Sequence, residues 1–298
     1  MFDLKKYLIE KQSAVNRALE NIIRQESTSE QRIVSAMRHS LMAGGKRLRP
    51  VLCLSAAEVV GGNEDQVLDA ACSLEMIHTY SLIHDDLPAM DDDAMRRGKQ
   101  TCHIAFDEAT AILAGDALLT MAFELLSTKN NLISPDYAFK KLDVIHKIAS
   151  AAGYMGMIAG QMADILSEGR NLDMEELKML HFAKTGALIE SSVYAGAVLG
   201  DGTHDEIKML TEYGRTIGLA FQVADDILNV EGDPEIMGKA VGTDRTRNKS
   251  TYPSIVGVEK SKQFAKKLVA DSLNALEMFD KKAEPLRAIA RYIIERKK

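Results

Sequence analysis

Residues 72–97 read CSLEMIHTYSLIHDDLPAMDDDAMRR, a helical segment that runs directly into a cluster of charges. The part up to residue 84 is mostly apolar, so the cluster begins at a helix C-terminus, where the helix dipole disfavours carboxylates. Asp85 and Asp86 leave that helix in different directions, and a bend at Pro88 returns Asp91 towards them. Carboxylates gathered at an electrostatic cost predict a divalent-cation site.

A second carboxylate cluster lies further along the chain. Gln222, Asp226 and Asn229 fall at i, i+4 and i+7, one stripe of a helix, and Asp225 lies beside them. Magnesium takes one or two protein carboxylates and leaves its other positions for water and phosphate oxygens. Two facing half-sites therefore predict a diphosphate held between them by metal ions. A solvated acidic loop explains one such run better than two, and the spacings fit neither zinc nor an EF-hand.

A glycine pair followed by cations, Gly44–Arg49 (GGKRLR), also interrupts the helical pattern. It lacks the GxxxxGK[ST] frame of a P-loop. Glycine lets the backbone approach an anion and arginine forks bind phosphate oxygens, so the run fits an anion site or a basic turn equally well. Arg96 and Arg97 after the first aspartates strengthen the anion-site interpretation. His78 lies two turns before Asp85, and a lone histidine there is more often a satisfied core residue.

Helical periodicity and capping signals extend through the chain, which predicts an all-α protein. Of its 298 residues 46% are hydrophobic and only six are prolines, and there is no linker, repeat or low-complexity tract. We expect one domain, residues 1–298, built as a bundle of about ten helices with short loops. Capping signals lie at Ser27 with Glu30, Asp173 with Glu176, Thr203 with Glu206, and Ser134–Pro135. The predicted helices are 3–25, 29–43, 48–60, 64–86, 104–127, 136–167, 173–200, 203–231, 252–279 and a short one after Pro285.

Composition and charge limit the partners and the location. The net charge of −6 gives no reason to expect a nucleic-acid partner. Charges interrupt every apolar stretch before about 18 residues, so membrane insertion is not expected. The N-terminus carries Asp3 and Glu10 and no apolar core of a signal, which favours the cytoplasm. Cys53, Cys72 and Cys102 have no CxxC spacing and are expected to be reduced, small apolar side chains.

Five motifs follow one another in a characteristic order. They are GGKRLRP at 44–50, HDDLPAMDDDAMRRG at 84–98, KTG at 184–186, FQVADDILN at 221–229 and GK at 238–239. In this order they resemble the trans-isoprenyl diphosphate synthases, most closely the bacterial farnesyl diphosphate synthases, over essentially the whole chain. The resemblance implies the all-α isoprenoid synthase fold, usually homodimeric, with a deep cavity between the helices.

The resemblance also implies the cofactor. In the family the two carboxylate clusters hold about three magnesium ions per active site, which fits the oxygen chemistry of this metal. The usual second motif is DDxxD, whereas residue 229 here is Asn, which keeps an oxygen but removes a charge. We expect weaker metal binding at that position and not inactivity. The implied metal ligands are Asp85, Asp86, Asp91 and Asp225.

The positively charged and polar motif residues are similar to those that bind two diphosphates. The direct partners of the allylic diphosphate are implied to be Arg96, Lys184 and Lys239. The isopentenyl diphosphate pocket is implied to be formed by Gly45, Lys46, Arg49, His78 and Arg97. Thr185 and Gln222 are similar to residues that face the developing carbocation. Gln161 and Asp164 lie in a GQxxD stretch that also resembles the family and receive no role.

The implied reaction is prenyl transfer from dimethylallyl and geranyl diphosphate to isopentenyl diphosphate. Magnesium and the cations stabilise the departing diphosphate, and the isopentenyl double bond attacks the allylic cation that forms. A proton is then lost, with the departing diphosphate as the base in the family. No side chain is needed as a nucleophile.

The length of the product is predicted from the residues before the first cluster. Tyr80 lies five residues before Asp85, and a ring at that depth closes the floor of the cavity, whereas Ser81 leaves some room. In the family, an aromatic residue there together with the long DDxxxxD spacing points to farnesyl diphosphate, the C15 product. An ordinary core tyrosine is the alternative interpretation of Tyr80.

Other functions stay open at this point. A geranylgeranyl diphosphate synthase is one alternative, and a non-catalytic subunit of a heteromeric prenyltransferase, supported only by Asn229, is another. An HD-type phosphohydrolase would use His84–Asp85 but leaves the second cluster unexplained. A terpene cyclase has the same fold and no use for Lys46 and Arg49.

Overall fold

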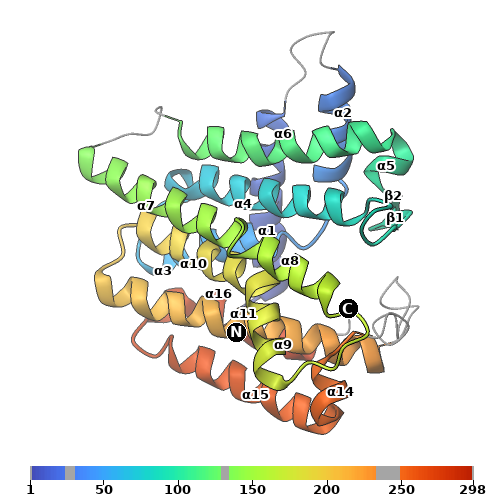
Figure 1. Cartoon of the computed structure of the whole chain (residues 1–298). Coiled ribbons are helices and arrows are strands. Elements are labelled where there is room, and N and C mark those ends of the chain that lie inside the picture. Colours follow the sequence, from blue (N-terminus) through green and yellow to red (C-terminus); the bar gives the residue numbers. More distant parts are fainter. Residues whose placement is uncertain (1, 24–30, 129–133, 233–248, 297–298) are drawn as a thin grey trace.

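The computed structural model describes residues 2–23, 31–128, 134–232 and 249–296, and these are almost entirely helical (Figure 1). The all-α prediction is confirmed. The described residues contain one small sheet, an antiparallel hairpin of β1 (Met95–Arg96) and β2 (Lys99–Gln100), which the sequence did not predict. It directly follows the first carboxylate cluster, where charges and Pro88 end the helical pattern.

Several predicted helices are continuous as expected, and others are divided. The continuous ones are α1 (Leu4–Ile22), α2 (Gln31–Leu41), α3 (Leu48–Val59), α4 (Glu64–Asp85), α11 (His204–Glu231) and α16 (Glu284–Glu295). The predicted helix 104–127 consists of α5 (Cys102–Ala105) and α6 (Glu108–Leu126), and the predicted helix 136–167 consists of α7 (Pro135–Ala152) and α8 (Met157–Leu166). The predicted helix 173–200 is divided into α9 (Met174–His181), the π-helix η2 (Phe182–Gly186) and α10 (Ala187–Leu199). The predicted helix 252–279 is divided into α14 (Tyr252–Val256) and α15 (Val258–Asn274). A 3₁₀ turn, η3 (Lys281–Ala283), leads into α16.

Local chemistry explains the divisions. Asp107 caps α6 by accepting a hydrogen bond from the backbone N–H of Thr110, so the chain restarts its helix there. Gly257 has φ of +85° and separates α14 from α15, a conformation that glycine adopts without strain. Apolar periodicity continues across both breaks, which is why the sequence pattern merged the pieces.

Three of the four predicted capping signals are confirmed. Asp173 and Thr203 form capping boxes with the glutamates three residues later, and the side chain of Ser134 accepts from the N–H of Tyr137. The pair Ser27 and Glu30 lies outside the described residues. A further capping box, Asn63 with Gln66, begins α4 and therefore sets the start of the helix that ends at the first carboxylate cluster.

The helices pack around two apolar clusters. Figure 1 shows α6, α4, α11 and α15 in successive layers, with α10 between α4 and α11 and with α1 behind α4. One cluster of buried side chains surrounds α4 and includes residues of α1, α6 and α7. The other lies between α11 and α15 and extends to α3 and α16. Since α10 contributes to both, it joins the two halves of the bundle.

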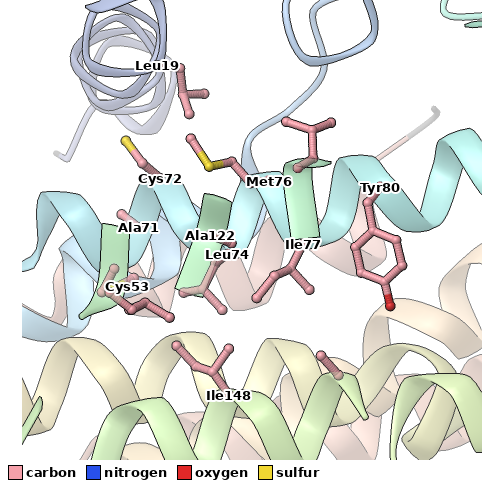
Figure 2. Packing of buried hydrophobic residues seen from close by; sticks show 14 of the residues in the cluster. Leu19, Cys53, Ala71, Cys72, Leu74, Met76, Ile77, Tyr80, Ala122 and Ile148 are labelled. Atoms are coloured by element: carbon pink, nitrogen blue, oxygen red, sulfur yellow. The ribbon is translucent and has the colours of Figure 1, made fainter. Parts of the chain in front are cut away.

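The buried stripe of α4 leads to the carboxylate cluster at its end. Figure 2 shows Leu74, Ile77 and Tyr80 on one side of this helix, whereas Cys72 and Met76 point towards Leu19 of α1. These α4 side chains are at most 6% exposed. Packing on both sides of α4 therefore holds its C-terminal end in place.

The α6 helix is long and apolar enough to cross a membrane by length and composition alone. In this structure 39% of that window is buried, and α6 packs against α4, α2 and α5. The three cysteines are free and buried, as expected.

Candidate active site

The first carboxylate cluster lies at the C-terminal end of α4. Asp85 is the last residue of the helix and Asp86 is its C-cap. The chain then turns within residues 86–91, and the backbone N–H of Asp91 donates to the carbonyl of Asp85 at 2.8 Å. Asp91 therefore returns to Asp85, as the bend at Pro88 predicted.

Asp86 is held by a cation from the β hairpin. It is 3% exposed, and Nε of Arg96 donates to its two oxygens at 2.7 and 2.9 Å. Burial raises the pKa of Asp86, and the hydrogen bonds from Arg96 oppose that rise. The hairpin thus places an implied diphosphate-binding cation directly on an implied metal ligand, and the two neutralise each other.

Asp85 lines a cavity and forms no ion pair within the described ranges. Burial raises the pKa of Asp85 to about 6, Lys184 opposes this rise and Asp91 adds to it. A desolvated carboxylate beside a second carboxylate is stabilised by a divalent cation, so these residues fit magnesium. In the described part of the chain no three acidic, imidazole or thiol side chains form a complete metal site, and magnesium needs only one or two protein carboxylates.

The cations of the glycine-rich turn take different roles. Arg47 is 2% exposed and donates to Glu75 at 2.7 Å, to Asn16 at 2.9 Å and to the carbonyl of Leu41 at 2.6 Å, which makes it a structural residue. Arg49 instead lines the cavity. Its Nε is buried without a partner in the described residues, and burial lowers its pKa to about 10.

A half-buried guanidinium whose Nε has no partner in the described part of the chain is well suited to an anion. The exposed Lys46 lies at the start of the turn, and its carbonyl accepts a hydrogen bond from Gln12 at 2.8 Å.

Gly45 and Arg97 lie in direct contact. A Cβ atom at Gly45 would lie 2.5 Å from Cζ of Arg97, whose Nη1 donates to the carbonyl of Gly44, so a side chain there would displace this guanidinium, and φ of +120° at residue 45 also favours glycine. His78 lines the same cavity as Arg49, and burial together with the charge of Arg49 lowers its pKa well below the usual value. His78 is therefore a neutral hydrogen-bonding group on the cavity wall and not a core histidine.

Lys184 and Thr185 lie in the π-helix η2, which packs closely against α8. A Cβ atom at Gly160 of α8 would lie 2.2 Å from the backbone nitrogen of Lys184, so glycine permits this approach. Nζ of Lys184 and Nζ of Lys249 each lie 2.7 Å from the same oxygen, Oδ2 of Asp164. Burial opposes the ionisation of Asp164, but the two lysines outweigh it and lower its pKa.

Sequence reasoning missed Lys249 and assigned no role to Asp164. Lys249 belongs to none of the quoted motifs, and its approach to Lys184 depends entirely on how α8, η2 and residues 249–251 pack. The sequence does indicate Asp164, because it lies in the GQxxD stretch that resembles the family.

The second carboxylate cluster is largely turned inward. Asp226 and Asn229 are 4% and 9% exposed. Asp226 accepts from Nε2 of Gln222 at 3.2 Å and from the backbone N–H of Tyr252 at 3.0 Å. The hydroxyl of Thr185 in turn donates to Oε1 of Gln222 at 3.3 Å. The predicted stripe exists, and it forms a hydrogen-bonded chain from η2 to α14.

Asp225 lies beside that stripe and faces another partner. Its Oδ1 lies 2.5 Å from Nη2 of Arg296, the C-cap residue of α16. Its side chain is 37% exposed, so it is the accessible carboxylate of the DDILN motif. Lys239, the third implied partner of the allylic diphosphate, lies outside the described residues.

Two hollows meet at Lys184. The larger, about 510 Å³, is mostly apolar and contains Asp85, Arg49 and His78. The smaller, about 110 Å³, is polar and contains Asp164, Gln222, Asp226 and Lys249. Lys184 lines both, so the two parts of the chain that carry the carboxylate clusters meet at one lysine. Arg96 and Arg97 line a third, small pocket beside Asp86.

Tyr80 and Ser81 both line the large cavity. Tyr80 is 6% exposed and its ring meets that of His84 edge-on at 5.8 Å, while the hydroxyl of Ser81 donates to the carbonyl of His78 at 2.9 Å. Residues of α8 and α6 that no motif indicated complete the wall. They are Leu119, Met157, Ile158, Met162 and Ile165.

The geometry agrees with what known proteins show. The sequence profile of the polyprenyl synthetase family matches residues 9–290. The chain belongs to the polyprenyl synthetase family. It is 48% identical over 301 residues to the heterodimeric geranylgeranyl pyrophosphate synthase large subunit 1 of Arabidopsis thaliana chloroplasts, covering 99% of this chain and 80% of that protein.

Two solved structures show the fold. A putative farnesyl-diphosphate synthase from Marinomonas sp. MED121 is 41% identical with a TM-score of 0.84, covering 99% of this chain and 100% of that one. An FPP/GFPP synthase from Zymomonas mobilis is 36% identical with a TM-score of 0.87, covering 98% of each chain. The isoprenoid synthase fold is thereby confirmed.

Membership of this family makes the chain a prenyltransferase that acts on isopentenyl and allylic diphosphates. Polyprenyl synthetases generally use Mg²⁺, in agreement with the carboxylates around Asp85. The HD-phosphohydrolase alternative is excluded. His84, which suggested it, has Nε2 3.0 Å from the carbonyl of Ile112 and packs against Gly115.

Proposed function

We propose that this polyprenyl synthetase extends dimethylallyl and geranyl diphosphate with isopentenyl diphosphate, with magnesium bound between its two carboxylate clusters. The position of Lys184 carries this proposal. It joins an apolar cavity that contains Asp85 to a polar pocket that contains Asp226. An allylic diphosphate has the same two parts, an apolar chain and a charged head. The carbon–oxygen bond of the substrate that breaks in the reaction would lie beside Lys184, where the cavity and the pocket meet.

The side chains divide the work of the reaction. Magnesium, when bound by Asp85, Asp91 and Asp225, would withdraw charge from the leaving diphosphate. Lys184 and Lys249, already held by Asp164, supply further positive charge in a fixed place, which is the preorganisation that stabilises a developing charge without rearrangement.

Arg49 and His78 line the same cavity and would hold the diphosphate of the second substrate. The oxygens of Thr185 and Gln222 would face the carbocation. The apolar walls exclude water, which would otherwise consume that cation. The isopentenyl double bond would be the nucleophile, and the departing diphosphate would accept the proton lost from the cation that forms after this attack, so neither a nucleophilic nor a basic side chain is required.

The product length has two candidates, each with its own support. Tyr80 lines the cavity as a buried ring, which supports farnesyl diphosphate and the predicted floor. The similarity to geranylgeranyl pyrophosphate synthases supports the C20 product, and over the curated relatives this second candidate is better supported than the first. Geranylgeranyl diphosphate is therefore the product that the comparisons favour, and we propose farnesyl diphosphate as the product that a floor at Tyr80 would give.

Product analysis separates the candidates. Purified protein with Mg²⁺, labelled isopentenyl diphosphate and geranyl diphosphate should give a C15 product if Tyr80 closes the cavity, and EDTA should abolish incorporation. Tyr80→Ala should lengthen the product, whereas the matched variant Tyr80→Phe keeps the ring and should not. A C20 product from the unmodified chain would establish the alternative and remove Tyr80 as the floor. Absence of incorporation with every allylic substrate would favour the non-catalytic subunit.

We also propose that the protein is a homodimer located in the cytoplasm. Exposed apolar side chains on neighbouring helices support an interface: Ile112 and Leu113 of α6 are 45% and 59% exposed, and Phe139 and Leu142 of α7 are 69% and 61% exposed. Light scattering should give twice the mass of the chain. A monomer at micromolar concentration would contradict the proposal.

A further inference from the structure

The last helix of the described chain ends on the second carboxylate cluster. Arg296 is the C-cap of α16, and its side chain is 3% exposed. It donates to Oδ1 of Asp225 at 2.5 Å, to the carbonyl of Phe221 at 3.2 Å and, through Nε, to the carbonyl of Ile293 at 3.2 Å. Its Cζ lies 4.1 Å from the centre of the Phe221 ring.

These contacts leave Arg296 little freedom. A buried guanidinium with three acceptors and an aromatic face has one favourable position, since the planar fork is preorganised for such contacts. Asp225 is more exposed, at 37%, and only one of its oxygens is used. Within the described ranges its Oδ2 makes no hydrogen bond. The rigid partner is therefore Arg296, and it fixes the carboxylate of Asp225.

The other oxygen ligands of the same motif are less available. Asp226 is occupied by Gln222 and by the N–H of Tyr252, and Asn229 is buried and lacks a charge. In DDILN, Asp225 is the more exposed of the two carboxylates, whereas Asp226 lines the polar pocket with its oxygens already accepting two hydrogen bonds. The orientation of one side chain then matters more here than in a motif with three aspartates.

We infer that Arg296 is a positioning residue that fixes the orientation of Asp225 for the metal. This inference rests on the proposed function, in which Asp225 is a magnesium ligand. Hydrogen-bonding partners behind a metal ligand orient it, and their loss typically lowers metal affinity or activity about 10–100-fold. Arg296 holds Oδ1 and leaves Oδ2 for the metal, so it contributes although it lies at the far end of the chain.

The test measures Mg²⁺ binding directly. Isothermal titration calorimetry with Mg²⁺ in the presence of inorganic diphosphate is carried out on the full chain and on Arg296→Met, which keeps the apolar stem. We expect about 10–100-fold weaker Mg²⁺ binding, and in assays a higher Mg²⁺ requirement with kcat at saturating Mg²⁺ changed much less. Arg291→Met removes an exposed arginine from the same helix and should leave Mg²⁺ binding unchanged.

Two further variants make the result unambiguous. Arg296→Lys keeps the charge but not the fork, so it should bind Mg²⁺ with intermediate affinity, and it serves if the Met variant fails to fold. If Arg296→Met binds Mg²⁺ as the unmodified chain does but melts at a lower temperature, Arg296 only holds α16 in place. That result would overturn the inference. Tighter binding would show that Arg296 competes with the metal and would also overturn it. Asp225→Asn tests the proposed function separately, because unchanged binding there would remove Asp225 as a ligand.

Discussion

The first carboxylate cluster lies at the end of a helix, whereas the second lies within one. Asp85 and Asp91 are brought together by a turn and border an apolar cavity. In α11 the regular backbone directs Asp226 inward, where it accepts two hydrogen bonds and lines the small polar pocket, and Asp225 is the more exposed of the two. Two aspartate-rich motifs of similar sequence therefore have different roles. The first gathers charge, and the second combines one exposed carboxylate with a structural network.

This difference predicts different consequences of removing a carboxylate. In the metal-free protein a desolvated carboxylate such as Asp85 has no metal cation beside it and destabilises the fold. Its replacement should therefore lower activity without lowering stability. Removal of a carboxylate that accepts hydrogen bonds from buried donors, such as Asp226, should lower both activity and stability.

Replacement of Asp85 should have the largest effect on activity. Asp85→Asn removes a proposed magnesium ligand, and with it the positive charge that would stabilise the leaving diphosphate, so kcat/KM should fall by about 10²–10³-fold or more. The melting temperature of the metal-free protein should not fall, because burial already opposes ionisation of Asp85. Asp92→Asn, an exposed neighbour in the same turn, is the matched control. Near-normal kcat/KM in Asp85→Asn would contradict the role of the first cluster.

Replacement of Asp226 should reduce stability as well. Asp226→Ala leaves the N–H of Tyr252 and the amide of Gln222 without an acceptor, and the free energy of unfolding should fall by about 1.5–3 kcal/mol. Glu231→Ala on the same helix removes only a surface ion pair with Lys262 and should cost less than about 1 kcal/mol. Urea unfolding measures both. If the two variants are equally stable, the network around Asp226 carries no stability.

The polar pocket of the second cluster should also show a dependence on pH. Burial lowers the pKa of His181 to about 3, from an ordinary value of 6.5. The folded state therefore favours the neutral ring: the stability this contributes is complete above about pH 6.5 and is lost as the pH falls towards 3. One proton changes stability by at most about 1.4 kcal/mol per pH unit in that window.

His181→Leu should therefore flatten the loss of stability between about pH 7.5 and pH 5, measured by urea unfolding, by about 2 kcal/mol at most. His204→Leu, at an exposed position, should keep the full dependence. Part of the dependence should remain, because burial also lowers the pKa of His78, but an undiminished dependence in His181→Leu would mean that the His181 ring does not contribute.

The smallest effect is expected at Asn229. Asn229→Asp restores the third aspartate of the family motif and should tighten Mg²⁺ binding in the presence of diphosphate only a few-fold, about 1 kcal/mol, since the position is 9% exposed. Calorimetry gives the affinity, with Arg291→Met as a surface control. A gain of a hundredfold or more would mean that the second cluster depends on residue 229 more than on Asp225.

Much of the bundle could be predicted from local sequence. Helix caps such as Thr203 with Glu206 and the periodicity of α11 depend on neighbours within one or two turns, so the pattern contains them. Breaks such as Gly257 could not be placed, because the apolar period runs through them. Among site residues, Asp85, Asp91, Arg49 and Lys184 were identified by motif, and the structure brings Asp85, Arg49 and Lys184 to one cavity.

The amino-acid sequence by itself determined the helices, the two carboxylate clusters and the family. Tertiary structure decided which side chains of those motifs reach the cavity. Arg47 donates to Glu75, whereas Nε of Arg49, two residues later, is buried without a partner in the described residues. Arg96 donates to Asp86. Lys249 and Arg296 reach the site from segments with no motif at all. The physical reason is that helix formation depends on neighbours in the chain, whereas the partner of a charge depends on segments brought together by packing.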